Sequence, residues 1–488
     1  MSTFLQAQEK AGHLELEATS FESASGQTIQ AQRGQLWVPE NRNKPQSEAI
    51  AITFVHLKST NPNPLAPIIY LEGGPGSSCT WQAENPGYLD YWLSFLAVSD
   101  VVLLDQRGTG QGSQRVLHIW QNEIPDDVFV SAQTAKNHMK NIAKEALPAL
   151  QNKGVDLRGY TTKQNAQDID DLRQKLGFEQ WNLFGFSYGT HLGQAYLRYF
   201  EDKVANAVLV GVEGPNHNYK LPLSMDQQFK KIALMAQQDP SIQKEIPDLV
   251  ALYQKVIQQL EEAPIELQVT SPLTRQPMKM KIGPFGLRLI MRLDIGDASD
   301  LPVFPRLLHS IQNGDYSILE WFVQKRISLV FGIQGMSTTM DLASGASLDR
   351  RSRIAKEEQK SLFPNVVNIS LDVYDELSGF WPTPDLGEAF RAPMSTAVPT
   401  LFMSGTLDFN TPPYQAEEIR WGFSNSQHLI VKNAGHEQIL SHPDAVDRIV
   451  QFLQGKKVDA SNLSHPALKF IPLTGKAGEV WHPSLGER

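Results

Sequence analysis

The sequence predicts an α/β fold with a mostly parallel central sheet and an inserted helical cap domain. Three observations predict it. Short apolar runs that end in Gly, Asp or Pro occur in the first and last parts of the chain, helical patterns separate several of them, and a long helical stretch interrupts the series. Strands that alternate with helices favour a parallel sheet with helices on both faces.

Five apolar runs are predicted to be strands buried on both faces, because each is almost continuous in apolar residues. These runs are residues 67–76 (PIIYLEGGPG), 100–110 (DVVLLDQRGTG), 181–189 (WNLFGFSYG), 207–215 (AVLVGVEGP) and 399–408 (PTLFMSGTLD). In open parallel sheets, ligands bind at the carboxyl ends of the strands. The glycine-rich turns that end these runs are therefore the first place to look for a functional site.

A helical pattern and a long insertion define the predicted domains. Residues 165–178 carry apolar residues at helical spacing directly before a predicted strand. Residues 216–391 are mostly helical in pattern and too long for a loop, so we predict that they form an inserted cap or lid. The predicted domains are residues 1–215 as the first part of the core, 216–391 as the cap and 392–488 as the second part of the core with a C-terminal tail.

Composition excludes several classes of function. The chain of 488 residues has a net charge of −9 and no dense run of Lys or Arg, so we expect no nucleic-acid partner. Its single cysteine, Cys79, excludes an intrachain disulfide and a multi-cysteine metal site. We expect neither a metal nor an organic cofactor, and the composition leaves the oligomeric state open.

The chain carries no pattern typical of targeting or membrane insertion. Its first residues lack a basic stretch followed by an apolar run, and no segment approaches the roughly 20 apolar residues of a membrane span. We therefore expect a cytoplasmic protein without membrane contact. A periplasmic or secreted location would follow if a leader had been removed.

Ser187 lies between Gly185 and Gly189 in the pattern Gly-x-Ser-x-Gly, which by itself occurs by chance in many proteins. Here an apolar run precedes the pattern and a helix-like segment, residues 190–200, follows it. A strand, a sharp turn and a helix are the context in which such a serine is exposed as a nucleophile. We therefore predict that Ser187 is a nucleophile rather than a polar residue at a tight turn.

A nucleophilic serine needs a base and an acid that orients the base, and both follow in the chain. Asp408 comes directly after one predicted strand, and His436 follows another in a small Ala-Gly-His turn. The hydrolysis of an acyl group also requires donors for an oxyanion, and the N–H group of Tyr188 is one candidate. The glycine-rich turn at residues 73–76 is predicted to supply the second donor.

These motifs resemble the proline iminopeptidase branch of the α/β-hydrolase superfamily, which also includes di- and tripeptidyl aminopeptidases. The matching motifs are GGPGSS at 73–78, DQRGTGQGS at 105–113, GFSYGT at 185–190, SGTLDFNTPP at 404–413 and AGHEQ at 434–438, with VPENR at 38–42 similar to an opening strand. The resemblance implies an α/β-hydrolase fold. The motifs lie in both halves of the core, whereas the cap resembles that of the family only weakly.

The resemblance also implies roles for individual residues. It makes Ser187 the nucleophile, His436 the general base and then acid, and Asp408 the residue that fixes the histidine tautomer. The N–H groups of Gly74 and Tyr188 would stabilise the oxyanion. By the same resemblance, Asp105 and Arg107 would brace the oxyanion turn as a charge-assisted pair. One departure is Glu72, which stands where typical proline iminopeptidases carry a histidine before the glycines.

An aminopeptidase must also recognise a charged α-amine, which requires carboxylates at a fixed distance from the nucleophile. Glu213 ends the strand that follows the nucleophile helix and is the first candidate, with a helix cap or ion pair as the alternative. Asp341 and Glu320 in the cap are further candidates, with a solvated or structural role as the alternative. Six aromatic residues could line an apolar pocket, or belong to the core: Trp81, Tyr188, Phe285, Trp321, Phe331 and Trp381.

The sequence therefore predicts a serine hydrolase that acts on a peptide or small-molecule substrate. The favoured function is an aminopeptidase similar to proline iminopeptidases, which cleaves N-terminal residues through an acyl-enzyme. The alternative is a carboxylesterase or amidase that uses the same triad on an uncharged substrate. A catalytically idle binding protein would not need Ser187, Asp408, His436 and both glycine turns together.

Overall fold

A sheet of nine strands forms the core of the protein. The computed structural model describes residues 11–110, 117–121, 123–377, 379–459, 461 and 463–475. In spatial order the strands of the sheet are β1 (Leu14–Glu22), β2 (Thr28–Pro39), β3 (Ala49–Leu57), β5 (Ser99–Leu104), β4 (Leu65–Leu71), β7 (Trp181–Phe186), β8 (Val204–Val210), β12 (Thr400–Gly405) and β13 (Ser426–Val431). All five predicted strands lie in this sheet, and the predicted fold class is confirmed.

The sheet is antiparallel at one end and parallel over the rest. Strands β1, β2, β3 and β5 pair antiparallel, whereas β5, β4, β7, β8, β12 and β13 pair parallel. Every residue of β7 and of β12 is buried, as expected of strands covered on both faces. The carboxyl ends of the parallel strands therefore lie along one edge, where the turns after β4, β7, β8 and β12 come together.

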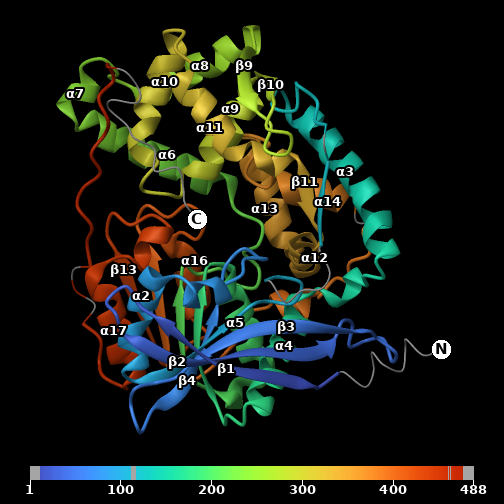
Figure 1. The fold of residues 1–488 in the computed structure, drawn as a ribbon. Helices are drawn as coiled ribbons and strands as arrows, with labels where there is room; N and C mark the ends of the chain where they lie inside the picture. The colour runs from blue at the N-terminus through green and yellow to red at the C-terminus, as the bar shows by residue number, and fades with distance from the viewer. Residues whose placement is uncertain are drawn as a thin grey trace.

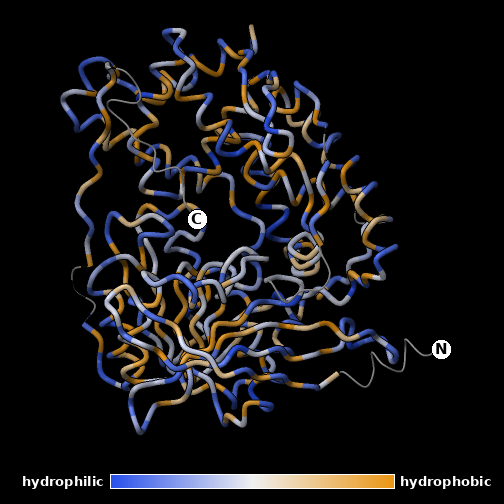
Figure 2. The backbone as a smooth tube through the Cα atoms, in the orientation of Figure 1, coloured by the Kyte–Doolittle hydropathy of each residue, from blue (hydrophilic) through white to orange (hydrophobic). Residues whose placement is uncertain are grey.

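Helices cover both faces of the sheet. The helices of the core are α2 (Pro86–Leu96), α4 (Thr162–Lys175), α5 (Tyr188–Phe200), α16 (Pro413–Arg420) and α17 (Pro443–Leu453). One hydrophobic cluster joins Leu172 of α4 and Leu192 of α5 to the sheet, and a separate cluster joins Trp92 of α2 and Ile449 of α17 to it. In Figure 2 hydrophobic segments gather along the strands of this layer.

The cap lies above the carboxyl edge of the sheet (Figure 1). Its helices are α6 (Pro222–Gln237), α7 (Pro240–Gln243), α8 (Leu249–Glu262), α9 (Pro284–Asp294), α10 (Phe304–Gln312), α11 (Ser317–Arg326), α12 (Gly335–Ser344), α13 (Leu348–Glu358), α14 (Ile369–Glu376) and α15 (Glu388–Arg391). It also contains the antiparallel pair β9 (Ile265–Thr270) and β10 (Pro277–Ile282), which the helical pattern of the sequence does not indicate.

A segment that precedes the nucleophile in the chain also packs against the cap. Strand β6 (His118–Trp120) pairs with β11 (Gly332–Gln334), and the long helix α3 (Ala132–Asn152) runs along one side of the cap. Ala135, near the start of α3, belongs to the hydrophobic cluster of the cap, whereas Leu150, near its end, belongs to a cluster of the core. Helix α3 thus joins the two parts.

The C-terminal tail crosses from the core to the cap. In Figure 1 it rises along the left edge of the molecule from the region of α17 to the cap. The buried guanidinium of Arg306 in α10 donates hydrogen bonds to the main-chain oxygens of Pro472, Thr474 and Gly475. The tail residue Ile471 also donates a main-chain hydrogen bond to Pro302 in the cap. The tail thus forms a strap over one side of the interface between the core and the cap.

Candidate active site

The turn between β7 and α5 presents Ser187 at the carboxyl edge of the sheet. Ser187 has φ of 55° and ψ of −125°, a backbone conformation that a residue with a side chain adopts only under strain. Its N–H group donates to Val210 O at 2.9 Å, and its own carbonyl accepts from the N–H and hydroxyl groups of Thr190. Such a strained turn between a strand and a helix is the geometry that exposes a nucleophilic serine.

Two glycines make this turn possible. A Cβ atom at Gly189 would lie 1.8 Å from the carbonyl oxygen of Leu71, and one at Gly185 would lie 2.5 Å from the carbonyl oxygen of Gly189. Real Cβ atoms do not approach backbone so closely, so no other residue fits at either position without moving the strand. The Gly-x-Ser-x-Gly spacing therefore reflects the packing of α5 against β4.

The carboxylate of Asp408 and the imidazole of His436 form a buried pair. Asp408 Oδ2 accepts from His436 Nδ1 at 2.8 Å and from the Thr411 hydroxyl at 2.6 Å, while Oδ1 accepts from the Thr411 N–H group at 3.0 Å. Nδ1 is therefore the protonated nitrogen, because a carboxylate can only accept. The other nitrogen, Nε2, is then the one able to take a proton.

The pair shifts both pKa values in opposite directions. Burial disfavours the charged form of each group, but the attraction between Asp408 and His436 and their hydrogen bond outweigh it. The pKa of His436 is therefore raised and the pKa of Asp408 is lowered. The pairing thus favours the ionised form of the Asp408 carboxyl and makes the His436 imidazole a stronger base than a free histidine.

Ser187, His436 and the glycine turn after β4 converge. The His436 ring lies 4.9 Å from the ring of Phe186, the neighbour of Ser187, measured between centroids. In the glycine turn, a Cβ atom at Gly73 would lie 2.9 Å from Ser187 Cβ, so only a glycine lets this turn approach the serine so closely. The structure thus brings together the residues that the sequence predicts as nucleophile, base, acid and oxyanion turn.

The two predicted oxyanion residues belong to the two turns that meet at Ser187, since Gly74 follows Gly73 and Tyr188 follows Ser187. Gly74 is exposed and has φ of 115°, in the region that favours glycine. Tyr188 is the first residue of α5, where main-chain N–H groups have no partner within the helix. The side chain of Tyr188 is buried, and its hydroxyl oxygen lies 2.8 Å from that of Thr162.

Asp105 braces the oxyanion turn, but the predicted pair with Arg107 is wrong. Asp105 Oδ1 accepts hydrogen bonds from the Ser78 hydroxyl and from the N–H groups of Cys79 and Thr80. Arg107 instead forms a bidentate pair with the buried Asp168, with N–O distances of 2.6 and 2.7 Å. The two side chains of the motif therefore hold different segments, and its last residues, 111–113, lie outside the described part of the chain.

The cap holds the loops that carry Asp408 and His436. The buried Gln228 of α6 donates to Leu407 O at 2.6 Å, next to Asp408. The main-chain N–H group of His436 donates to Gly296 O in the cap at 2.8 Å. Gln438 also bonds to the cap, from Nε2 to Asp297 Oδ1 at 3.0 Å. The positions of Asp408 and His436 thus depend on the cap as well as on the sheet.

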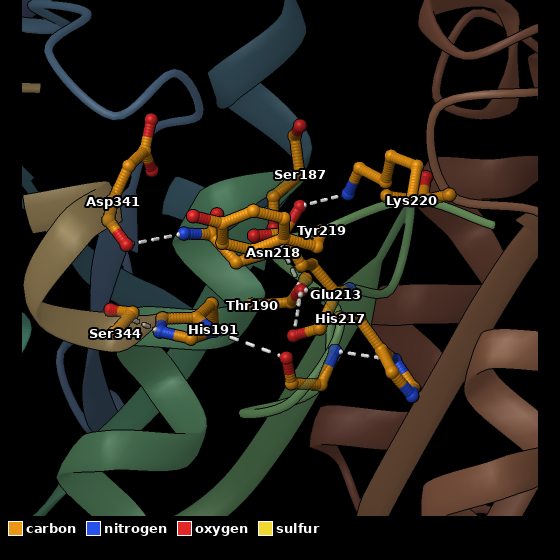
Figure 3. A network of polar contacts seen from close by, with 12 residues as sticks. Ser187, Thr190, His191, Glu213, His217, Asn218, Tyr219, Lys220, Asp341 and Ser344 are labelled. Atoms are coloured by element: carbon orange, nitrogen blue, oxygen red, sulfur yellow. Dashed lines mark hydrogen bonds and ion pairs between the residues drawn. The ribbon is translucent and has the colours of Figure 1, made fainter. Parts of the chain in front are cut away.

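An acidic group lies beside the serine turn, on the side of α5. Glu213 is buried, its N–H group donates to the Thr190 hydroxyl at 2.8 Å, and its carboxylate forms an ion pair with Lys220 (Figure 3). Burial opposes ionisation of Glu213, but the cation of Lys220 lowers the pKa of the carboxyl below its usual value. Glu213 and Lys220 therefore form a charged, internally neutralised pair.

Asp341 of α12 belongs to the same group. Its side chain and that of Ser187 extend to the same side of the network in Figure 3. Its Oδ1 atom is buried and has no hydrogen-bond partner among the described residues, while its main-chain oxygen accepts from Asn218 at 2.8 Å. Burial and the nearby charge of Glu213 raise the pKa of Asp341 to about 8. A cation that entered here would find one carboxyl oxygen, Oδ1, without a hydrogen-bond partner among the described residues.

The third predicted carboxylate is not part of this group. Glu320 is exposed in the first turn of α11, in the upper part of the cap in Figure 1. Sequence reasoning also missed Lys220, Thr411 and Gln228, whose roles depend on contacts between distant segments. Thr411 alone had a signal, since it lies within the motif that contains Asp408.

Two further properties concern the described residues as a whole. They contain no group of His, Cys, Asp or Glu side chains arranged to hold a metal ion. No helix among them has both the length and the hydropathy that crossing a bilayer requires.

The fold is that of an α/β hydrolase. Residues 66–443, well over half of the chain, match the model of the alpha/beta hydrolase fold family, and the chain belongs to that family. This confirms the resemblance seen in the motifs at the level of the family.

Among curated proteins the chain is similar to peptidases. It is 28% identical over 209 residues to the tripeptidyl aminopeptidase of Streptomyces lividans, a match that covers 41% of this chain and 39% of that protein. It is 26% identical over 192 residues to the serine protease Hip1 of Mycobacterium tuberculosis, covering 38% and 36%. A probable proline iminopeptidase of Streptomyces coelicolor is 30% identical over 146 residues, covering 30% and 32%. The chain thus spans less than half the length of these relatives.

Matches to solved structures are more distant. The proline iminopeptidase of Mycobacterium smegmatis is 13% identical with a TM-score of 0.42, covering 86% of this chain and 98% of that one. A thermophilic esterase from Thermogutta terrifontis is 15% identical with a TM-score of 0.37, covering 86% and 97%. A similarity at this level says nothing about the substrate.

Proposed function

We propose that this protein is a serine aminopeptidase, similar to proline iminopeptidases, that cleaves N-terminal residues from peptides through an acyl-enzyme. The observation that carries the proposal is the pairing of the Ser187 turn with the buried carboxyls of Glu213 and Asp341. The names of its relatives, which include tripeptidyl aminopeptidase and probable proline iminopeptidase, agree with it.

Ser187, His436 and Asp408 are the proposed catalytic triad. Ser187 Oγ attacks the carbonyl carbon of the scissile amide while His436 Nε2 takes its proton. The tetrahedral oxyanion accepts hydrogen bonds from the N–H groups of Gly74 and Tyr188. Collapse of this intermediate breaks the C–N bond, and the His436 imidazolium donates its proton to the departing amine. A water molecule, deprotonated by the same nitrogen, then hydrolyses the acyl-enzyme and releases the N-terminal fragment.

Asp341 and Glu213 are the proposed partners of the substrate α-ammonium group. The free site is close to neutral, because Lys220 pairs with Glu213 and the raised pKa of Asp341 keeps its carboxyl protonated at neutral pH. An arriving ammonium would favour ionisation of Asp341, since an opposite charge lowers the pKa of a carboxyl. Binding of a free N-terminus would therefore release the proton of Asp341. An acetylated N-terminus carries no positive charge and would leave Asp341 protonated.

A matched set of substrates tests this proposal. It consists of Pro-, Ala- and tripeptidyl-arylamides, the same compounds with an acetylated amine, and a short aryl ester, each assayed with wild-type protein and with Asp341→Asn. We expect acetylation to abolish turnover, and we expect Asp341→Asn to lower kcat/KM for free amines by about tenfold or more, as removal of a buried charge partner does. The ester should lose less than about twofold.

The matched control is Glu320→Gln, because Glu320 is also a cap carboxylate but lies exposed and outside the group. It should leave the kcat/KM values of all substrates unchanged. The proposal fails if the ester is the best substrate and acetylation is harmless, which would instead indicate a carboxylesterase or amidase. It also fails if Asp341→Asn weakens ester and amine substrates equally.

A further inference from the structure

A chain of buried polar groups joins helix α5 of the core to helix α12 of the cap. His191 lies in α5, one helical turn after Ser187, and Ser344 is the last residue of α12. Ser344 Oγ lies 3.1 Å from His191 Nε2 (Figure 3). The other ring nitrogen, Nδ1, lies 3.1 Å from Gly214 O, and Ser344 Oγ lies 3.2 Å from Thr162 Oγ1. We call this set the polar chain, and its members in order are Tyr188, Thr162, Ser344, His191 and Gly214.

The direction of each hydrogen bond in the polar chain follows from its last member. A carbonyl oxygen only accepts, so His191 Nδ1 carries the proton that Gly214 O accepts, and His191 Nε2 is an acceptor. Ser344 must then give its single proton to Nε2, and it accepts from Thr162. Because Thr162 has used its own proton, it accepts from the hydroxyl of Tyr188.

This order requires a neutral His191, and its surroundings keep it neutral. Burial lowers the pKa of the ring below its usual value, although the charge of Glu213 opposes the shift. The side chains of Thr162, Tyr188 and Ser344 are buried as well. A buried donor or acceptor that loses its partner is destabilising, so each contact of the polar chain constrains the next. Helix α12 therefore cannot shift along α5 without breaking one of them.

The polar chain holds the part of α12 that carries Asp341. Asp341 precedes Ser344 by less than one helical turn, so a displacement of Ser344 moves Asp341 with it. Met340, the neighbour of Asp341, also contacts the polar chain, since its sulfur lies 3.2 Å from the hydroxyl oxygen of Tyr188. The position of Asp341 relative to α5 thus depends on contacts made on both sides of it in the helix.

The other end of α12 lies against the oxyanion turn. Gln334 directly precedes α12, and a Cβ atom at Gly76 would lie 2.9 Å from its side-chain amide. The N–H group of Gly335, the first residue of α12, donates to Leu117 O at 2.9 Å. Helix α12 therefore reaches from the oxyanion turn to α5, and it carries Asp341 between these two contacts.

The distance between Ser187 and Asp341 matters for the proposed reaction. The α-ammonium group and the scissile carbonyl carbon belong to one substrate molecule, so both must fit their partners at the same time. A misplacement of about 1 Å can lower the rate of such a reaction by about 10²-fold. An ester that carries no amine makes no contact with Asp341 and is free of this requirement.

We propose that His191 and Ser344 are positioning residues for amine recognition, which fix the distance between Ser187 and Asp341 without contacting the substrate. This inference rests on the proposed function, because it takes Asp341 as the partner of the α-ammonium group. Loss of the polar chain lets α12 shift relative to α5. Substrates with a free amine are then impaired selectively.

Variants that break the polar chain test this proposal. Ser344→Ala removes the hydroxyl at its centre, and His191→Leu removes both ring nitrogens at a similar volume. We expect each variant to lower the amine-to-ester ratio of kcat/KM by about fivefold or more, whereas kcat/KM for the ester should change less than about twofold. His191→Gln keeps an acceptor for Ser344 and a donor, so its ratio should stay within about twofold of the wild type.

A double variant shows whether Ser344 acts through Asp341. In the Asp341→Asn background, Ser344→Ala should change the amine-to-ester ratio by less than about 1.5-fold, because the carboxyl that it positions is gone. Two reductions that multiply in the double variant would overturn the proposal. If Ser344→Ala does not fold, His191→Leu takes its place in this comparison.

Ser317→Ala is the matched control. Ser317 is also a serine in a cap helix, but it is exposed in α11 and its hydroxyl donates to the nearby Asp315. This variant should keep the amine-to-ester ratio of the wild type.

The outcomes separate this inference from the proposed function. If Asp341→Asn lowers the amine-to-ester ratio but Ser344→Ala and His191→Leu leave it unchanged, the positioning role is overturned while the aminopeptidase activity stands. Equal losses on amine and ester substrates in these two variants would also overturn it, since they would show that the polar chain only stabilises the fold. Turnover of the ester by the wild type without cleavage of any free-amine substrate would overturn both.

Discussion

The two halves of the candidate active site are held in place in different ways. On the nucleophile side, Ser187 and the glycine turn after β4 are fixed by main-chain packing within the core, where a Cβ atom at Gly189 would collide with β4. On the acid–base side, the loops of Asp408 and His436 receive hydrogen bonds from the cap, through Gln228 and Gly296. Packing within the core thus fixes Ser187, whereas the core and the cap together fix Asp408 and His436.

This difference shows that the cap contacts the loops of the candidate site as well as covering them. Leu407 and Phe409, on either side of Asp408, are buried in the hydrophobic cluster of the cap. A displacement of the cap would therefore move the acid with it, whereas Ser187 would stay. Variants in each half should accordingly fail in different ways.

The largest effect should come from the nucleophile side. We expect Ser187→Ala to lower kcat/KM by about 10⁴- to 10⁶-fold on every substrate, because no other group in the triad can attack the carbonyl carbon. Its Tm should not fall, because alanine keeps the Cβ atom of Ser187 and removes only the hydroxyl oxygen, which leaves no cavity. Circular dichroism and arylamide hydrolysis measure the two properties. Near-normal turnover would remove Ser187 from the mechanism.

The pH dependence separates the amine site from the triad. Since the pKa of His436 is raised, kcat/KM for the ester should decline as pH falls and the base becomes protonated. For free amines, ionisation of Asp341 adds a second dependence, so the amine-to-ester ratio should rise by up to about tenfold per pH unit toward pH 8. Above this it should fall as the α-amine, with a pKa near 7.7–8.0, loses its proton.

The rise in this ratio should disappear in Asp341→Asn, because that variant has no carboxyl to ionise. The ester profile should keep its acidic limb, since His436 is unchanged. If the ratio keeps its slope in the variant, another group must titrate, and Asp341 does not receive the amine.

A smaller effect on catalysis should follow from removing a hydrogen bond between the cap and the loop of Asp408. Gln228→Ala removes the donor to Leu407 O and leaves that buried carbonyl unsatisfied, a cost of about 1 to 3 kcal/mol. We expect kcat to fall about tenfold on ester and peptide alike, with KM nearly unchanged, because the base is displaced rather than the substrate. Gln237→Ala, at an exposed position of the same helix, is the control. A loss confined to one class of substrate would contradict this role.

The smallest effect on catalysis should come from the strap. Arg306→Ala removes the hydrogen bonds that hold the tail against α10, and we expect Tm to fall by about 2 to 4 °C. Turnover at 25 °C should change less than about twofold. Lys244→Ala, an exposed cap cation, should leave Tm unchanged. An unchanged Tm in Arg306→Ala would show that the tail adds no stability.

The sequence predicted the core well because its constraints are local. Gly185, Ser187 and Gly189 lie within one turn, and the five predicted strands are continuous apolar runs. The cap was predicted only as a helical insertion, and the alternating residues of β9 and β10 were missed within it. Asp341 and Glu320 looked alike in the sequence, because the burial that distinguishes them arises from distant segments. The same limit explains why Arg107 was assigned to Asp105 instead of Asp168.

The strap also has a consequence for the order in which the protein is made. Synthesis proceeds from the N-terminus, so Ser187 leaves the ribosome before the cap, the cap before Asp408 and His436, and all of them before residues 463–475. An unfinished chain therefore carries its serine without a base, and a cap without the tail that packs against it. Under the proposed function, hydrolytic activity would therefore arise only after Asp408 and His436 have been translated and packed against the cap.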